Sequence, residues 1–142
     1  MFTKNPYFFA FFPFALADAV LTILGQPQTY WRYGIVNEAS PAYYVLQFSP
    51  YAFIAAVVVW LIIWYIIFLK LSRGIALYLS LFFIATHAWG STSWVFVLLR
   101  DAGFYNPSNQ TTVIQAWFVA MAYLAVLSAV SAYFLKKASL SE

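Results

Sequence analysis

The chain has no cysteine and very little charge. Its 142 residues include only 8% charged side chains, a single histidine and five glycines. The absence of cysteine excludes disulfides, thioether-linked haem, cysteine-ligated iron–sulfur clusters and thiol chemistry. A net charge of +3 is too small for a nucleic-acid-binding surface, so we expect no nucleic-acid partner. The remaining composition, 65% hydrophobic and 23% aromatic, is typical of a polytopic membrane protein rather than a soluble domain.

Four long apolar segments stand out along the chain. Each reaches the roughly 20 residues that a helix needs to cross about 30 Å of hydrocarbon. Lipid forces such a segment to be helical, because every backbone polar group must find a partner within it. The sequence therefore predicts an all-α, polytopic integral membrane protein, with residues 1–142 forming a single four-helix bundle. The predicted spans are residues 5–24, 41 or 51 to 69, 74–99 and 111–135, with an exterior loop at 25–40.

The start of the second span is open to two interpretations. Ser40-Pro41 is a good helix start, because serine caps helix N-termini and proline fits the first helical position. A helix that begins there and ends at Leu69 is about 43 Å long, so it would protrude or tilt, with a kink at Pro50. The other interpretation begins the helix near Tyr51.

The distribution of lysine and arginine predicts the orientation of the spans. Positive residues concentrate on the cytoplasmic side of membrane proteins. Both termini and the second loop carry most of these residues, so we expect both termini in the cytoplasm. The majority group is Lys4, Lys70, Arg73, Lys136 and Lys137, and the minority group is Arg32 and Arg100.

A few polar residues inside the apolar segments are the candidate functional residues. Asp18 lies within the first span, where a carboxylate is costly and is usually kept for a use. His87 lies at a similar depth, since both residues are roughly 18–20 Å along spans that run in the same direction. Thr22 and Ser91 lie one helical turn beyond them, on the same helix faces. With Glu38, just ahead of the second helix, these residues form the candidate intramembrane polar site.

Three interpretations of this polar set remain open. It can be a hydrogen-bonded network that fixes helix register, a binding or proton-handling site, or a metal site. Asp18, Glu38 and His87 are acceptable zinc or iron ligands, but their spacing matches no diagnostic metal motif. The sequence assigns no catalytic residue and leaves any cofactor undetermined.

Small residues form a stripe along the fourth span. Their spacing of three and four residues places them on one helix face, where small side chains allow close helix approach. Packing within the bundle and packing against another subunit both fit this predicted helix-packing face. Its members are Ala122, Ala125, Ala129 and Ala132.

The first part of the chain resembles a group of small prokaryotic membrane proteins. The residues that carry the resemblance are Leu16-Ala-Asp18-Ala-Val-Leu-Thr22, then Gly25, then Glu38-Ala-Ser40-Pro41. This pattern is similar to the DUF5658-type family, in which Asp-x-x-x-Thr precedes a short loop and Glu-x-Asn-Pro opens the second span. The present chain has Ser40 in place of asparagine and a longer, aromatic loop. The family has no established activity. The resemblance implies only that Asp18, Thr22, Glu38 and Pro41 act together, in a prokaryotic cytoplasmic membrane.

Two functions follow as hypotheses. The first is a non-catalytic accessory subunit of a larger membrane complex, which contacts lipid and other integral membrane subunits and helps to hold lipid or cofactor. The alternative is an independent small transporter or intramembrane enzyme built on Asp18, Glu38 and His87. The alternative predicts a cavity that reaches Asp18, whereas a dry bundle with Asp18 fully hydrogen-bonded to neighbouring helices counts against it. The directions in which Asp18 and His87 point therefore discriminate between the two.

Overall fold

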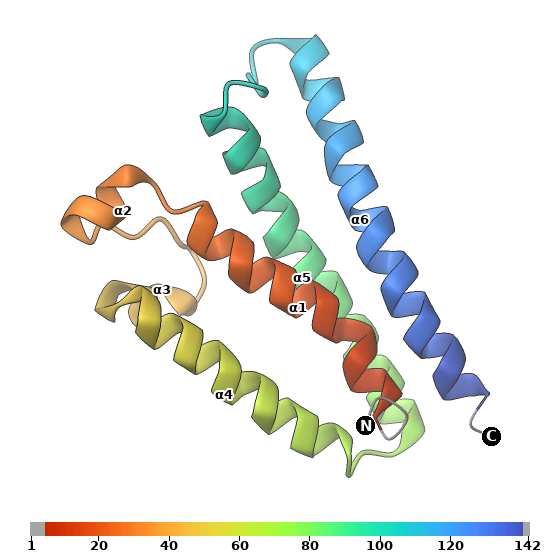
Figure 1. Ribbon diagram of the computed structural model, residues 1–142. Coiled ribbons are helices and arrows are strands. Elements are labelled where there is room, and N and C mark those ends of the chain that lie inside the picture. Colours follow the sequence, from red (N-terminus) through yellow and green to blue (C-terminus); the bar gives the residue numbers. More distant parts are fainter. Residues whose placement is uncertain (1–4, 141–142) are drawn as a thin grey trace.

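The computed structural model describes residues 5–140, and within that range every regular element is a helix (Figure 1). In chain order the helices are α1 (Pro6–Leu24), α2 (Gln28–Tyr33), α3 (Ala42–Phe48), α4 (Pro50–Phe68), α5 (Arg73–Asp101) and α6 (Gln110–Ser139). Four of them, α1, α4, α5 and α6, are long and apolar enough to cross a membrane. An all-α protein with four candidate membrane spans is therefore confirmed.

The boundary between α3 and α4 decides where the second long helix begins. Ser49 has an extended backbone (φ −174°, ψ 157°), and its hydroxyl accepts a 2.9 Å hydrogen bond from the Ala52 N–H. Pro50 then takes the first position of α4, where its missing N–H costs nothing. The interpretation of one long helix from Pro41, kinked at Pro50, is wrong, because the Ser49 cap separates two helices.

Residues 25–40, predicted as a loop, contain the short helix α2. Gly34 ends this helix in the left-handed conformation (φ 70°), which favours glycine. Tyr30 is buried in a small cluster with Leu46 of α3 and Phe53 of α4, and its hydroxyl donates a 3.1 Å hydrogen bond to the Leu46 carbonyl. This contact fixes α2 over the end of α4 that adjoins α3.

Helix α1 lies between the other long helices and contacts α4, α5 and α6 (Figure 1). Phenylalanines from its first half form the largest buried cluster, together with Phe68 of α4 and Phe83 of α5. Polar side chains also fasten α1 to each neighbour, because each donates a hydrogen bond across a helix–helix contact to a backbone carbonyl. These donor–acceptor pairs are Asn5 with Tyr65, Ser80 with Tyr7, and Ser131 with Ala10.

Helices α4 and α5 meet at one end and diverge toward the other (Figure 1). Near their connecting turn, the rings of Trp64 and Phe83 lie 4.7 Å apart between centroids, and those of Trp60 and Phe83 lie 5.5 Å apart. Toward the other end the two helices separate, and few direct contacts join them. The divergence leaves room for a cavity beside α1.

The inward face of α6 is not the predicted alanine stripe. Ala122, Ala125, Ala129 and Ala132 are all exposed in the chain, so the interpretation that they pack within it is wrong. The helix packs on α1 and α5 through an adjacent face, whose buried residues are also small. The fully buried residues of α6 are Ala116, Ala120, Ser131 and Ala138.

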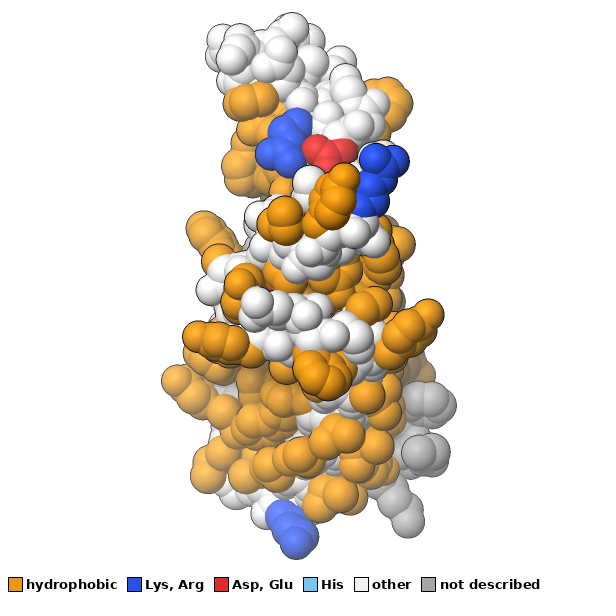
Figure 2. Space-filling model, turned by 90° about the vertical axis from the view of Figure 1, so that its left-hand side faces the viewer, with side chains coloured by type: hydrophobic (Ala, Val, Ile, Leu, Met, Phe, Trp, Pro, Cys, Tyr) orange, Lys and Arg blue, Asp and Glu red, His pale blue; other side chains and the backbone are white. Residues whose placement is uncertain are grey.

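The surface of the molecule is mainly apolar. In Figure 2 hydrophobic side chains cover most of one face, while charged side chains gather toward one end and a single basic side chain lies at the other. Only 11% of the most apolar window of α4 is buried, and the same fraction holds for α6. Outward-facing hydrophobic residues on long helices are what a lipid environment stabilises.

Candidate functional site

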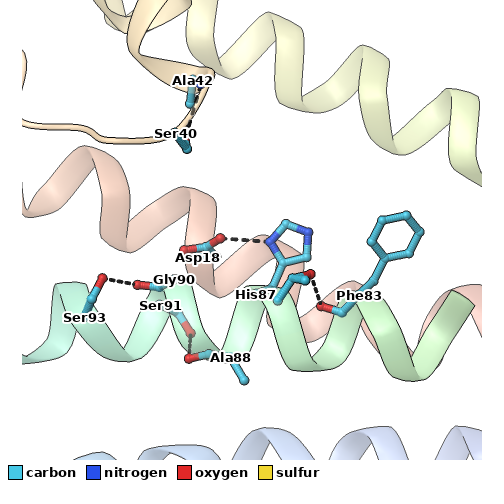
Figure 3. Close-up of polar contacts among 10 residues, drawn as sticks. Asp18, Ser40, Ala42, Phe83, His87, Ala88, Gly90, Ser91 and Ser93 are labelled. Carbon is cyan, nitrogen blue, oxygen red and sulfur yellow. Dashed lines mark hydrogen bonds and ion pairs between the residues drawn. The ribbon is translucent and has the colours of Figure 1, made fainter.

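The central polar contact of the structure joins Asp18 of α1 to His87 of α5. The Asp18 Oδ2 atom lies 2.8 Å from Nδ1 of His87, and both side chains are about one-fifth exposed. Figure 3 shows the two side chains pointing toward each other, on the side of the molecule that carries Ser40. The prediction that the two residues lie at the same depth is confirmed.

This contact fixes which imidazole nitrogen is free. A carboxylate accepts a hydrogen bond, so Nδ1 of His87 carries the donating proton. In neutral imidazole the Nε2 atom is then an acceptor. Among the described residues no side chain or backbone group bonds to Nε2. The pair therefore presents an unengaged proton acceptor whose tautomer is set by the carboxylate.

The contact depends on the close approach of α1 and α5. A Cβ atom built on Gly90 would lie 2.7 Å from Oδ1 and 2.9 Å from Oδ2 of Asp18, so only glycine leaves room for the carboxylate here. On its other side the His87 ring packs edge-on against Trp60, with 5.5 Å between ring centroids. The imidazole is thus held by a carboxylate and by an aromatic ring.

A cavity of about 660 Å³ adjoins the pair. Its walls come from α1, α3, α4, α5 and the loop residues 38–40. Ala56 of α4 and Thr86 of α5 line the cavity and are nevertheless exposed, as is Trp89 at 83%. The cavity therefore opens sideways between α4 and α5, and it is open as well on the side of the loop, where Ala39 and Ser40 line it and are exposed. Its polar or ring-bearing lining residues are Asp18, Thr22, Glu38, Ser40, Phe53, Trp60, Thr86, His87, Trp89, Ser93 and Trp94.

Glu38 reaches the cavity because the loop is tied back to α1. The buried Gln26 side chain accepts a 3.0 Å hydrogen bond from the Asn37 N–H, which precedes Glu38 directly. The Glu38 Oε1 atom then accepts a 2.8 Å bond from the Ser40 N–H. The loop thereby brings a second carboxylate, that of Glu38, to the cavity that Asp18 also lines.

The structure brings together four of the five predicted site residues. Asp18, Thr22, Glu38 and His87 all line the cavity. Ser91 does not: it is completely buried, and its hydroxyl donates a 3.3 Å bond to the Ala88 carbonyl. Four residues correspond to about 400° of helix rotation, so Ser91 is turned about 40° away from His87.

A metal centre receives no support from the geometry. Across residues 5–140 no three histidine, aspartate or glutamate side chains are placed to hold one ion. Asp18 and His87 bond to each other rather than converging on the position of a common metal ion.

Aromatic residues of the cavity wall were missed by sequence reasoning, among them Phe53, Trp60 and Trp89. Trp60 contacts His87, yet it lies in an uninterrupted apolar run that carries no polar signal. Outside the cavity, Tyr123 of α6 lies beside Ser91, and its buried hydroxyl has no hydrogen-bond partner of normal geometry among the described residues. A tyrosine in the middle of an alanine-rich span was the only available signal.

Comparisons with known proteins assign the chain to no family. No protein-family model matches the chain, and neither does any curated protein or solved structure. The resemblance of the first part of the chain to the DUF5658-type family stays a prediction.

Proposed function

We propose that this chain is an independent membrane protein that binds a small amphiphilic molecule between its helices and carries it through the membrane. One observation supports this choice over the others. The Asp18–His87 pair lies in the wall of an open cavity of about 660 Å³, not inside a closed helix contact. That volume lies within the range of about 300–1,000 Å³ typical of small-molecule sites.

A purely structural role for the pair is a poorer fit to its surroundings. A register-fixing network gains most when its members are fully buried and fully hydrogen-bonded. Here both side chains keep about one-fifth of their surface exposed, and Nε2 of His87 has no bonding partner among the described residues. A binding site needs such unused polar capacity.

A carrier fits the site better than an enzyme. A serine or threonine nucleophile is activated by a hydrogen bond to a base. The hydroxyls of Thr86 and Ser93 donate instead to the backbone carbonyls of Phe83 and Gly90, at 3.2 and 2.6 Å. The Asp18–His87 pair is equipped to hold a ligand and to accept a proton, and no hydroxyl of a described residue is hydrogen-bonded to it.

Cysteine labelling tests whether the cavity is open to water. The chain has no cysteine, so single substitutions carry the only thiol. Thr86→Cys places a thiol in the cavity, and Ala125→Cys places one on the outer face of α6, about equally far from the α5–α6 connection. Maleimides react with the thiolate, which forms only where water reaches the sulfur.

We expect a water-soluble maleimide to modify Thr86→Cys at least about tenfold faster than Ala125→Cys in lipid nanodiscs. A lipid-soluble maleimide should reduce this difference, which controls for local crowding. Equal rates of modification by the water-soluble reagent would show a dry cavity and would overturn the proposed function.

An accessory subunit is the second candidate, and the exposed stripe of α6 favours it. Ala122, Ala125, Ala129 and Ala132 form a helix face of small residues that is exposed in the part of the chain that the structure describes. Small residues of this kind allow close approach of a partner helix. Extraction in mild detergent, followed by size analysis and mass spectrometry, tests this candidate. Stoichiometric co-migration with larger integral membrane subunits would support it, and a small homogeneous species would exclude it.

A further inference from the structure

The charges of the cavity walls indicate which molecules the cavity accepts. We infer that it selects an organic cation with an apolar body, such as a lipophilic amine or quaternary ammonium ion. This inference rests on the proposed binding function and specifies its ligand class.

The charged groups of the cavity wall are of one sign. Asp18 and Glu38 line the cavity, and no lysine or arginine does. His87 adds at most one positive charge and is already paired with Asp18. The wall is therefore net negative whether His87 is neutral or protonated, so an anionic ligand would meet uncompensated repulsion.

No lysine or arginine among the described residues forms an ion pair with Glu38. Among the described residues, the side chain of Glu38 has one hydrogen bond, which it accepts from the Ser40 N–H, and no ion pair. Arg32, the nearest basic residue in sequence, forms no ion pair with Glu38 among the contacts of the described residues, and Arg100 pairs with Asp101 at 3.1 Å. A carboxylate without a counter-ion beside a low-dielectric cavity attracts a positively charged ligand.

The aromatic residues of the wall suit the same ligand. Trp60, Trp89 and Trp94 line the cavity, and tryptophan offers the strongest face for a cation. Trp89 lies at the sideways opening, where 83% of its surface is free. It can therefore cover a bound ligand without displacing another side chain.

The position of the opening requires the ligand to have an apolar body. The cavity opens between α4 and α5, two of the helices long and apolar enough to cross a membrane. A strongly hydrated ion would lose its water there at high cost, whereas a cation surrounded by apolar groups partitions into lipid. The two carboxylates then favour it over neutral molecules of the same shape.

A pair of probes with one shape and opposite charges tests the inference. Tetraphenylphosphonium and tetraphenylborate are both lipophilic tetraphenyl ions. We would measure the binding of each to the full-length protein in nanodiscs of zwitterionic lipid by equilibrium dialysis, with protein-free nanodiscs as the background. Saturable binding of the phosphonium, with none of the borate above background, is the expected result.

Two substitutions locate the site of binding. Asp18→Asn should weaken phosphonium binding about tenfold, and Glu38→Gln about threefold. Asp101→Asn is the matched control, because Asp101 is an exposed acid outside the cavity. Glu38→Gln lies in an exposed turn and leaves the helix contacts intact, so its effect is readable even where Asp18→Asn impairs folding.

The outcomes separate this inference from the proposed function. Equal binding of both ions, or phosphonium binding that is unchanged in Glu38→Gln and Asp18→Asn, would overturn the cation selectivity. Absence of phosphonium binding would overturn it too. In each of these cases fast labelling of Thr86→Cys would still leave the cavity and its binding function standing.

Discussion

Replacing Gly90 with alanine perturbs the Asp18–His87 contact directly. The new Cβ atom would lie 2.7 Å from Oδ1 of Asp18, while ordinary van der Waals contact begins at 3.4 Å. The carboxylate must therefore retreat by about 0.7 Å, which its side-chain torsions allow. A retreat of this size directed away from His87 would lengthen the 2.8 Å bond to it beyond the normal hydrogen-bond range of about 3.2 Å.

The free-energy change of Gly90→Ala has two opposing parts. A hydrogen bond to a charged group is worth about 1.5–3 kcal/mol when buried. The partial exposure of this pair reduces that to about 1–2 kcal/mol. Alanine in a helix interior restores about 1 kcal/mol relative to glycine. We therefore expect a loss of at most about 1 kcal/mol in stability, together with a large change in the geometry of the site.

Nitrogen NMR of the imidazole measures that change in isolation. His87 is the only histidine, so selective ¹⁵N-histidine labelling gives signals from this residue alone. We expect Gly90→Ala to remove the preference for the tautomer with the proton on Nδ1. Gly74→Ala, in the same helix, is the control because a Cβ there meets nothing within 4 Å. Histidine signals that are identical in Gly90→Ala and wild type would refute the close approach of Asp18 to Gly90.

Three further substitutions have defined outcomes. Burial raises the pKa of Tyr30 above its ordinary value. The unfolded chain then releases its proton first, so stability should fall as pH rises through about 10 in denaturant titrations of wild type but less in Tyr30→Phe. Ser131→Ala removes the buried hydrogen bond to the Ala10 carbonyl, and should cost about 0.6–1.7 kcal/mol by the same titrations. Gly25→Ala would place a Cβ atom 2.2 Å from the Trp94 ring. We therefore expect the free energy of unfolding to fall by more than about 1 kcal/mol. A thermal midpoint equal to that of wild type would contradict this packing.

Apolar run length was sufficient to predict the four long helices. The lipid constraint turns any such run into a helix, so local propensity and packing hardly matter for its existence. Depth was equally predictable, because counting residues from Pro6 and from Gly74 places Asp18 and His87 at one level. The limits of these helices were less predictable: a helix does begin after Ser40-Pro41, but it ends at Phe48, and the Ser49 cap starts α4 separately.

Rotation about the helix axis was the part that the sequence did not determine. Small residues favour close approach, yet the alanine stripe of α6 is exposed while Gly90 forms the tight contact. Both are small-residue positions, and only the shapes of the facing side chains decide which one is used. Ser91 was assigned to the site by the same spacing rule that correctly assigned Thr22. The aromatic wall residue Trp60 could not be singled out, because nothing in its run differs from lipid-facing sequence.

The divergence of α4 from α5 leads to a last prediction, about motion. Helix α4 has few direct contacts with α5 and is held mainly at its two ends, whereas α6 packs on both α1 and α5. Weakly packed elements sample more conformations than the core does. A spin-label pair at Val59→Cys and Ala85→Cys, both exposed, reports the distance between α4 and α5. A second pair at Ala85→Cys and Ala125→Cys reports the distance between α5 and α6.

We expect the distribution of α4–α5 distances to be the broader of the two and to narrow when tetraphenylphosphonium is added, with the distribution of α5–α6 distances unchanged. If both distributions are equally narrow without ligand, α4 is a rigid wall, and the ligand must enter a preformed opening rather than one that α4 widens.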